Sequence, residues 1–166
     1  MYSLHEERRV LVDATADRVF AALDNPTRMT SHMSETSWRM GGGKMETVVD
    51  TAHGQQVGSH IILRGRAFGI RLFVEEVVTV REPPTRKIWE TIGTLRLLTI
   101  GSYRMSFEVT PGPAGAELRV GIDYQLPASG IGRVLGCFFG RAYARWCVRQ
   151  MTASAINLFA RSRGAV

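Results

Sequence analysis

The sequence predicts an α+β fold in which an antiparallel sheet of about six to seven strands wraps around a long C-terminal helix. Residues 131–163 contain no proline, and their apolar residues recur at steps of three and four, which is typical of an amphipathic helix. Residues 37–126 are typical of strands separated by Gly and Pro turns. A single helix after such a sheet must bury its apolar face against it. We therefore expect the sheet to grip the helix, with an apolar cavity between them.

The N-terminal region predicts a strand followed by two short helices. Val10 and Val12 favour extension within residues 8–12. Thr15 is suited to cap a first helix, and Asn25-Pro26 ends it. A second short helix is expected over 26–32.

The middle of the chain predicts the sheet through turn chemistry and alternation. Beyond the first strand, strands are expected at about 45–50, 58–65, 70–80, 86–92, 101–110 and 116–126. Two of them alternate strictly, which indicates one wet face and one buried face. The residues expected on the buried face are Tyr103, Met105, Phe107, Val109, Leu118, Val120, Ile122, Tyr124 and Leu126.

Length and composition predict a single domain over residues 1–166. The hydrophobic fraction of 45% is that of an ordinary soluble protein. No apolar run approaches the roughly 20 residues that span a bilayer. The first nine residues show no secretory signal, so a cytoplasmic location is expected. Cys137 and Cys147 fall in one predicted helix, too far apart to form a disulfide with each other.

The positive charge is spread along the chain. The 21 basic residues exceed the 15 acidic ones by six, and 19 of the basic residues are arginine. They form no run and no motif with interleaved aromatic residues, which argues against nucleic-acid binding. Transient contact with an anionic membrane surface stays open. The oligomeric state is not indicated.

The sequence offers no metal site and no nucleotide cofactor site. His5, His32, His53 and His60 are dispersed, and neither cysteine has a CxxC partner. The glycines near Lys44 and at 130–132 do not complete a phosphate-binding fingerprint. We therefore expect no metal and no cofactor.

A helical wheel of the C-terminal helix predicts which of its residues line the cavity. The residues that share one apolar sector are Ile131, Leu135, Phe138, Ala142, Trp146 and Ile156, with Arg149 in its middle and Arg145 close to its edge. Arg149, or in second place Arg145, could anchor an anionic ligand through a carboxylate, enolate or phosphate. Alternatively, it reaches water or pairs with a buried acid, Glu76 or Glu90.

The strands and the helix together give a set of predicted ligand-binding residues. They are Tyr103, Met105, Phe107, Tyr124, Leu135, Phe138, Ala142, Trp146 and Arg149. The two tyrosines either orient a polar ligand atom or pack in the core. His60 is either a general acid or base or a surface residue, and its face and that of Trp89 stay undetermined.

The order of elements resembles the START-like superfamily, which includes polyketide cyclase/dehydrase and lipid-transport proteins and the Bet v 1 type proteins. The resemblance lies in residues 10–26, in Pro83-Pro84 followed by Ile88-Trp89, and in residues 143–146, and it extends over essentially the whole chain. It implies a helix-grip fold and the binding of lipids, polyketides or similar apolar molecules. Some members are cyclases, aromatases or dehydratases, but no fixed catalytic set is shared, so the resemblance assigns no catalytic residue.

Two functions remain open from the sequence. A carrier or sensor needs only a cavity with a few orienting polar groups. A polyketide cyclase, aromatase or dehydratase also needs an acid/base pair within reach of its substrate. The mostly apolar inner face favours binding of a small hydrophobic molecule, without deciding whether the protein is an enzyme.

Overall fold

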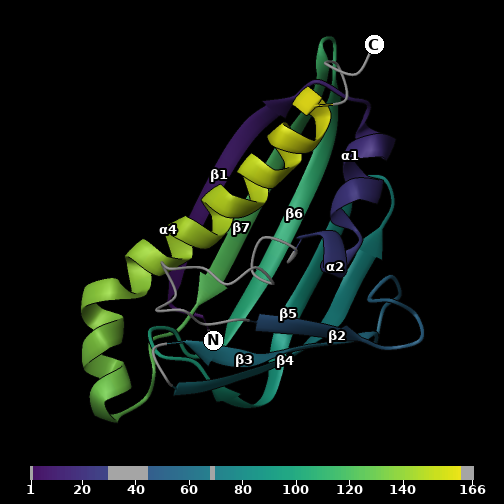
Figure 1. Ribbon diagram of the computed structural model, residues 1–166. Helices are drawn as coiled ribbons and strands as arrows, with labels where there is room; N and C mark the ends of the chain where they lie inside the picture. Colours follow the sequence, from purple (N-terminus) through teal and green to yellow (C-terminus); the bar gives the residue numbers. More distant parts are fainter. Residues whose placement is uncertain (1, 30–44, 68–69, 162–166) are drawn as a thin grey trace.

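The structure, a computed structural model, describes residues 2–29, 45–67 and 70–161. Its strands form one antiparallel sheet of seven, in the order β1-β7-β6-β5-β4-β3-β2. The long helix α4 lies across one face of this curved sheet, along β1 and β7 (Figure 1). The predicted α+β helix-grip architecture is confirmed.

The elements follow the expected order along the chain. The strands are β1 (Leu4–Val12), β2 (Met45–Val49), β3 (His60–Ala67), β4 (Ile70–Glu82), β5 (Arg86–Arg96), β6 (Tyr103–Gly112) and β7 (Gly115–Tyr124). The helices are α1 (Ala16–Leu23), α2 (Pro26–Met29) and α4 (Gly130–Arg161). The second helix is a single turn of four residues, and the remainder of its predicted range lies outside the described residues, as does Trp38.

Helix α1 covers the β6 and β7 end of the sheet. Thr15 occupies the N-cap position as predicted, although its side chain makes no capping hydrogen bond. Val19, Phe20 and Leu23 are buried and belong to the main core. Because these residues are three and four apart, one apolar face of α1 meets the inner face of the sheet.

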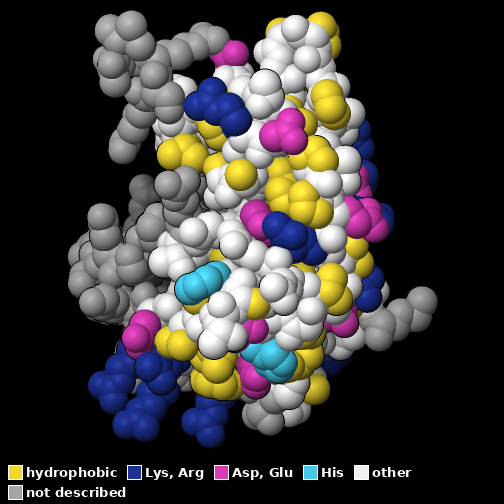
Figure 2. Space-filling model, turned by 90° about the vertical axis from the view of Figure 1, so that its right-hand side faces the viewer, with side chains coloured by type: hydrophobic (Ala, Val, Ile, Leu, Met, Phe, Trp, Pro, Cys, Tyr) yellow, Lys and Arg dark blue, Asp and Glu magenta, His cyan; other side chains and the backbone are white. Residues whose placement is uncertain are grey.

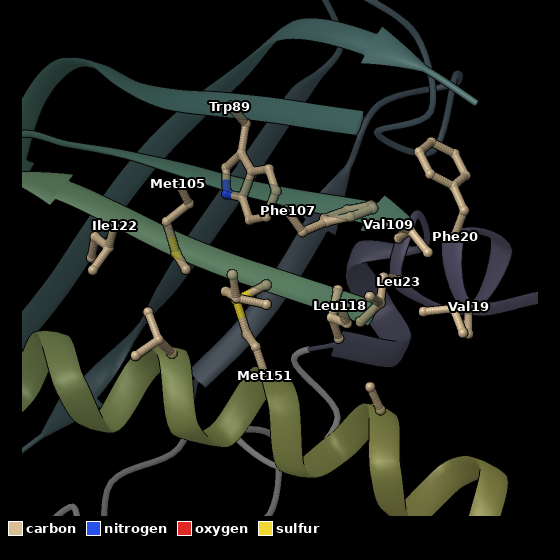
Figure 3. Close-up of a cluster of buried hydrophobic side chains, with 14 of the residues drawn as sticks. Val19, Phe20, Leu23, Trp89, Met105, Phe107, Val109, Leu118, Ile122 and Met151 are labelled. Atoms are coloured by element: carbon tan, nitrogen blue, oxygen red, sulfur yellow. The ribbon is translucent and has the colours of Figure 1, made fainter. Parts of the chain in front are cut away.

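The inner face of the sheet is the one that alternation predicts. Tyr103, Met105, Phe107 and Val109 of β6 and Leu118, Val120, Ile122 and Tyr124 of β7 are all buried. Met151 of α4 points toward this face, near Met105 and Leu118 (Figure 3). The core therefore lies between the sheet, α1 and the second half of α4.

The outer surface of the sheet carries charged pairs. His60 bonds Glu75 at 2.9 Å between Nδ1 and Oε1, and Arg64 bonds Glu46. Figure 2 shows one side of the molecule, with Lys and Arg side chains gathered at its lower end.

In the described residues, no helix is long and apolar enough to cross a membrane.

The rotation of α4 differs from the prediction. The residues buried against the rest of the protein are Gly136, Gly140, Ala144, Val148, Met151, Thr152, Ala155 and Phe159. The helical wheel places the bulky apolar residues inward, and this is wrong for Ile131, Phe138 and Ile156, which are 79%, 76% and 38% exposed. The reason is close packing: a Cβ on Gly136 would lie 2.8 Å from the Thr99 carbonyl oxygen, and one on Gly140 would lie 3.0 Å from it. Small residues let α4 approach the chain there, which leaves the large side chains on its other face.

Candidate functional site

A buried carboxyl group lies on the inner face of β4. Glu76 is only 4% exposed, and it lies between Val74 and Val78, which are each 1% exposed. The alternation of the strand turns all three inward and leaves Glu75 partly exposed beside His60. An ionisable group has thereby been placed in an apolar core, where a charge is costly unless it is compensated.

Neutral hydrogen-bond donors from neighbouring strands meet Glu76. The Tyr103 hydroxyl donates to Glu76 Oε1 at 2.5 Å, and the Trp89 side chain also hydrogen bonds the carboxylate. Burial raises the pKa of Glu76 to about 7, against the opposing effects of these two bonds and of the Lys87 charge. Glu76 can therefore gain or lose a proton near neutral pH.

Tyr103 is fixed by the backbone as well as by its hydroxyl. The regular pairing of β5 with β6 ends at Glu90 and Arg104. Beyond it, the Thr91 side chain accepts a bond from the Tyr103 amide at 3.0 Å and donates to the Tyr103 carbonyl at 3.2 Å. Thr91 thus replaces a missing ladder pair and holds Tyr103 in place.

Helix α4 brings a thiol and a second phenol to the same region. Tyr143 and Cys147 share a side-chain hydrogen bond, and both interact electrostatically with Glu76. Burial raises the pKa of the Cys147 thiol to about 12. The pKa of Tyr143 is also raised, by the charge of Cys147 and by burial. We call the group formed by Glu76, Trp89, Tyr103, Tyr143 and Cys147 the inner polar cluster.

A second buried polar group lies where α1 ends. Lys87, which is 2% exposed, donates from Nζ to Asp24 Oδ1 at 2.8 Å, to the Asp24 carbonyl at 2.8 Å and to the Gly54 carbonyl at 2.7 Å. Arg81 also binds the Asp24 carboxylate, with Nη2 at 2.8 Å from Oδ2. Because all its donors are engaged, Lys87 ties α1 and the Gly54 turn to the sheet.

A surface depression of about 420 Å³ adjoins that ion pair. It is lined by residues of α1 and of the β4–β5 turn, among them Phe20, Asp24, Arg81 and Pro84. The salt bridges to Asp24 lower its pKa against the opposing effect of burial, which keeps the carboxylate charged. The negative charge of Asp24 at this depression is therefore compensated within the protein.

The predicted site residues of the sheet lie on the inner face. Tyr103 belongs to the inner polar cluster, and Met105 lies next to it, paired with Trp89. Phe107 packs against Phe20 and Trp89, with ring centroids 5.3 and 6.2 Å apart. Tyr124 is buried at the β1 side, where Glu6 and burial raise its pKa. Of the four predicted sheet residues, Tyr103 is the one that hydrogen bonds the Glu76 carboxylate.

The predicted site residues of α4 are placed differently. Trp146 is partly buried and stacks on Tyr143, with 5.8 Å between ring centroids, and Leu135 is also partly buried. Phe138, Ala142 and Arg149 are exposed, so the prediction that they line the space facing the sheet is corrected. Glu76 is paired with Tyr103 and Glu90 with Arg104, and neither bonds Arg149.

The other undetermined residues are settled by the register. His60 lies on the outer face with Glu75, and Trp89 points inward. The sequence named Glu76 as a possible buried partner of Arg149, but not as a site residue. The pattern of β4 does not decide between the two adjacent glutamates, because Glu75 is flanked on its face by Phe73 and Val77 and Glu76 by Val74 and Val78. Within the part of the chain that is described, no cluster of three His, Cys, Asp or Glu could hold a metal.

Solved structures with this fold include enzymes. Norcoclaurine synthase from Thalictrum flavum, solved with dopamine and hydroxybenzaldehyde, is 13% identical, with a TM-score of 0.63 over 93% of this chain and 85% of that one. The di-domain ARO/CYC StfQ of the steffimycin biosynthetic pathway is 15% identical, with a TM-score of 0.68 over 98% of this chain, which spans about half (52%) of StfQ. A protein from Chromobacterium violaceum is 16% identical, with a TM-score of 0.63 over 93% of this chain and 96% of that one. At these identities the likeness shows the fold alone.

Family membership rests on the sequence itself. No curated protein matches the chain at a significant level. The family described as polyketide cyclase/dehydrase and lipid transport matches residues 4–163, which is nearly the whole chain. The chain therefore belongs to the polyketide cyclase/dehydrase and lipid transport family.

Proposed function

We propose that the protein binds a small hydrophobic molecule, such as a lipid, a polyketide or another cyclic metabolite, between the inner face of the sheet and α4. In this proposal Glu76 and Tyr103 contact a polar group of the ligand, and Met105 and Trp89 contact its apolar body. The family and its fold support a ligand-binding domain. Ligand sites of this kind combine apolar walls with a few placed polar groups.

The observation that carries the proposal is the burial of Glu76 without a bonded cation. Its hydrogen-bond partners, Tyr103 and Trp89, are neutral, and among the described residues no salt bridge reaches it. The nearby Lys87 is bonded to Asp24 instead. A core that only had to be stable would gain from an apolar residue here, so the carboxyl group is better explained by a ligand that uses it.

Uptake of the neutral apolar dye Nile red tests this placement. Cys147→Trp puts a large ring on the inner side of α4 and should reduce dye uptake at least tenfold. Ala142→Trp adds the same ring on the exposed side of the helix and should leave uptake unchanged. Both variants are first checked for an intact cooperative thermal transition, and Met105→Trp repeats the test from the sheet if Cys147→Trp does not fold. Unchanged uptake in a folded inward variant would contradict the proposed site.

A second candidate, a polyketide cyclase, aromatase or dehydratase, is favoured by the proton affinity of Glu76. A carboxyl group whose pKa is about 7 can act as general base or acid at neutral pH. As base it would take a proton from the carbon between two ketone groups, and the resulting enolate would attack another carbonyl of the same chain. The C=O double bond of that carbonyl opens to an alkoxide, which takes the proton back from Glu76 to give a hydroxyl group. Tyr103 lies within hydrogen-bond distance of the carboxyl group, close enough to orient it.

The effect of Glu76→Gln on a linear poly-β-ketone substrate separates the two candidates. Loss of general-base catalysis should lower the cyclisation rate by roughly 10²- to 10⁴-fold while the affinity is retained. A binding protein would instead show no cyclisation above background in the native form, and only its affinity would change.

A further inference from the structure

The first half of α4 exposes an unusual amount of apolar surface. Ile131 is 79% exposed, Val134 59%, Phe138 76% and Phe139 56%. Ile131, Val134 and Phe138 are three and four residues apart, so they form one stripe along the helix. Phe139 extends this stripe sideways. We call these four residues the α4 apolar stripe.

Packing on the opposite side of the helix holds the stripe outward. A Cβ built on Gly132 would lie 3.4 Å from Pro127, and those on Gly136 and Gly140 would meet Thr99 and Leu126 at 3.4 Å or less. The glycines therefore bring that side of α4 against residues 98–100 and 126–127. The stripe cannot turn inward without breaking these contacts.

The charge of the same helix is entirely positive. Residues 130–161 contain five arginines and no Asp or Glu. Arg141 and Arg145 both bind Glu6, which compensates only one of their two charges. Arg149 is exposed on the outward side one turn beyond Arg145, and Arg133 is exposed in the first turn of the helix.

The shape of the molecule presents this surface at one end. In Figure 1 the first turns of α4, drawn in green, project beyond the sheet at the lower left. Figure 2 shows the side of the molecule that faces away from these turns, and on it basic side chains lie at the lower end. Arg66 and Arg71, which are both exposed, face each other across β3 and β4 where these strands approach residues 68–69.

We propose that the first half of α4 docks on an anionic lipid bilayer, with the α4 apolar stripe entering the interface and the arginines contacting lipid phosphates. Large exposed apolar patches mark interaction surfaces. A helix with aromatic and aliphatic residues beside arginines, and without acidic residues, fits a negatively charged interface. A second copy of this chain would place like charges face to face, which disfavours it as the occupant. Such docking goes beyond the proposed ligand binding and would bring the domain to a source of apolar ligand.

Vesicle flotation tests the docking surface. The full chain should bind vesicles of phosphatidylcholine with 30% phosphatidylserine at least tenfold better than pure phosphatidylcholine vesicles, and salt should weaken this binding. The double variant Ile131→Ser/Phe138→Ser should bind at least tenfold more weakly. Leu11→Ser is the matched control, because Leu11 is also 79% exposed but lies in β1, and it should bind as the native protein does.

Charge variants and a local probe complete the test. Arg133→Gln/Arg149→Gln should reduce binding to anionic vesicles more than Arg64→Gln, which removes an arginine from β3. A polarity-sensitive fluorophore on Cys137, in a Cys147→Ser background, should shift to the blue when vesicles are added. Absence of vesicle binding, equal loss with Leu11→Ser, or a dimer in solution that Ile131→Ser/Phe138→Ser dissolves would overturn the proposal.

Discussion

At the scale of single residues, Glu76 is the buried side chain best suited to exchange a proton near neutral pH. Its carboxyl group lies among valines and accepts bonds from a phenol and an indole, and no salt bridge to it is found among the described residues. Lys87, which precedes Trp89 by two residues in β5, is a contrasting buried ionisable side chain. It is equally buried but is fully bonded to Asp24 and Gly54. The Glu76 carboxyl group can therefore still take up or release a proton. Lys87 instead holds the end of α1 and the Gly54 turn against the sheet.

The pKa of Glu76 predicts how stability changes with pH. Its folded pKa of about 7 lies above its ordinary value of 4.5, so the folded state binds a proton more tightly than the unfolded state. The resulting stabilisation is complete below pH 4.5 and is lost as the pH rises through 7. Between pH 5 and pH 8 the native protein should therefore lose about 2–3 kcal/mol relative to Glu76→Gln, since one pKa unit is worth ~1.4 kcal/mol. Urea unfolding of both proteins across this range measures the difference.

Glu75→Gln provides the control for that measurement. Glu75 is adjacent in sequence but lies on the outer face with His60, so its replacement should not remove the loss between pH 5 and pH 8. Parallel pH dependence in the native protein and in Glu76→Gln would show that Glu76 has an ordinary pKa.

At the scale of elements, the strands were predictable and the rotation of α4 was not. Strict alternation identified the inner faces of β6 and β7 because each strand has only two faces. The helix offers apolar residues nearly all round, including Ile131, Phe138 and Met151, so a wheel weighted toward large side chains gave the wrong face. The inward face of α4 is the one on which Gly136 and Gly140 approach the Thr99 carbonyl closely. Thr99 lies in the loop between β5 and β6, so the sequence pattern of the helix alone does not reveal this contact.

The glycine contacts of α4 predict a contrast between two alanine variants. A Cβ at Gly136 would lie 2.8 Å from the Thr99 carbonyl and 2.9 Å from the Pro127 ring, neither of which can move easily. Gly136→Ala should therefore lower the free energy of unfolding by about 1 kcal/mol, as overpacking outweighs the gain in helix propensity. Gly132→Ala meets only ordinary contacts, from 3.4 Å, and should be neutral or stabilising.

Thermal unfolding compares these two variants with the native protein. A melting temperature for Gly136→Ala at or above that of Gly132→Ala would contradict the close approach of α4 to Thr99 and Pro127.

At the scale of the whole molecule, the sheet joins three regions with different tasks. The ion pairs of Asp24 with Lys87 and Arg81 fasten α1 to one end. The inner polar cluster lies between the sheet and the middle of α4. The first turns of α4 project from the other end with apolar and basic side chains exposed. The proposed membrane docking and the proposed ligand binding therefore use different regions of the molecule.

Thiol protection tests most directly whether the ligand lies beside the inner polar cluster. Cys147 belongs to that cluster, whereas Cys137 is exposed on the projecting part of α4. Alkylation rates are measured at pH 9 in Cys137→Ser and in Cys147→Ser, each with and without a saturating fatty acid or polycyclic aromatic compound. We expect the ligand to slow modification of Cys147 at least tenfold and to leave the rate at Cys137 unchanged. Bound ligand with no protection of Cys147, or with equal protection of both thiols, would contradict a site between the sheet and α4.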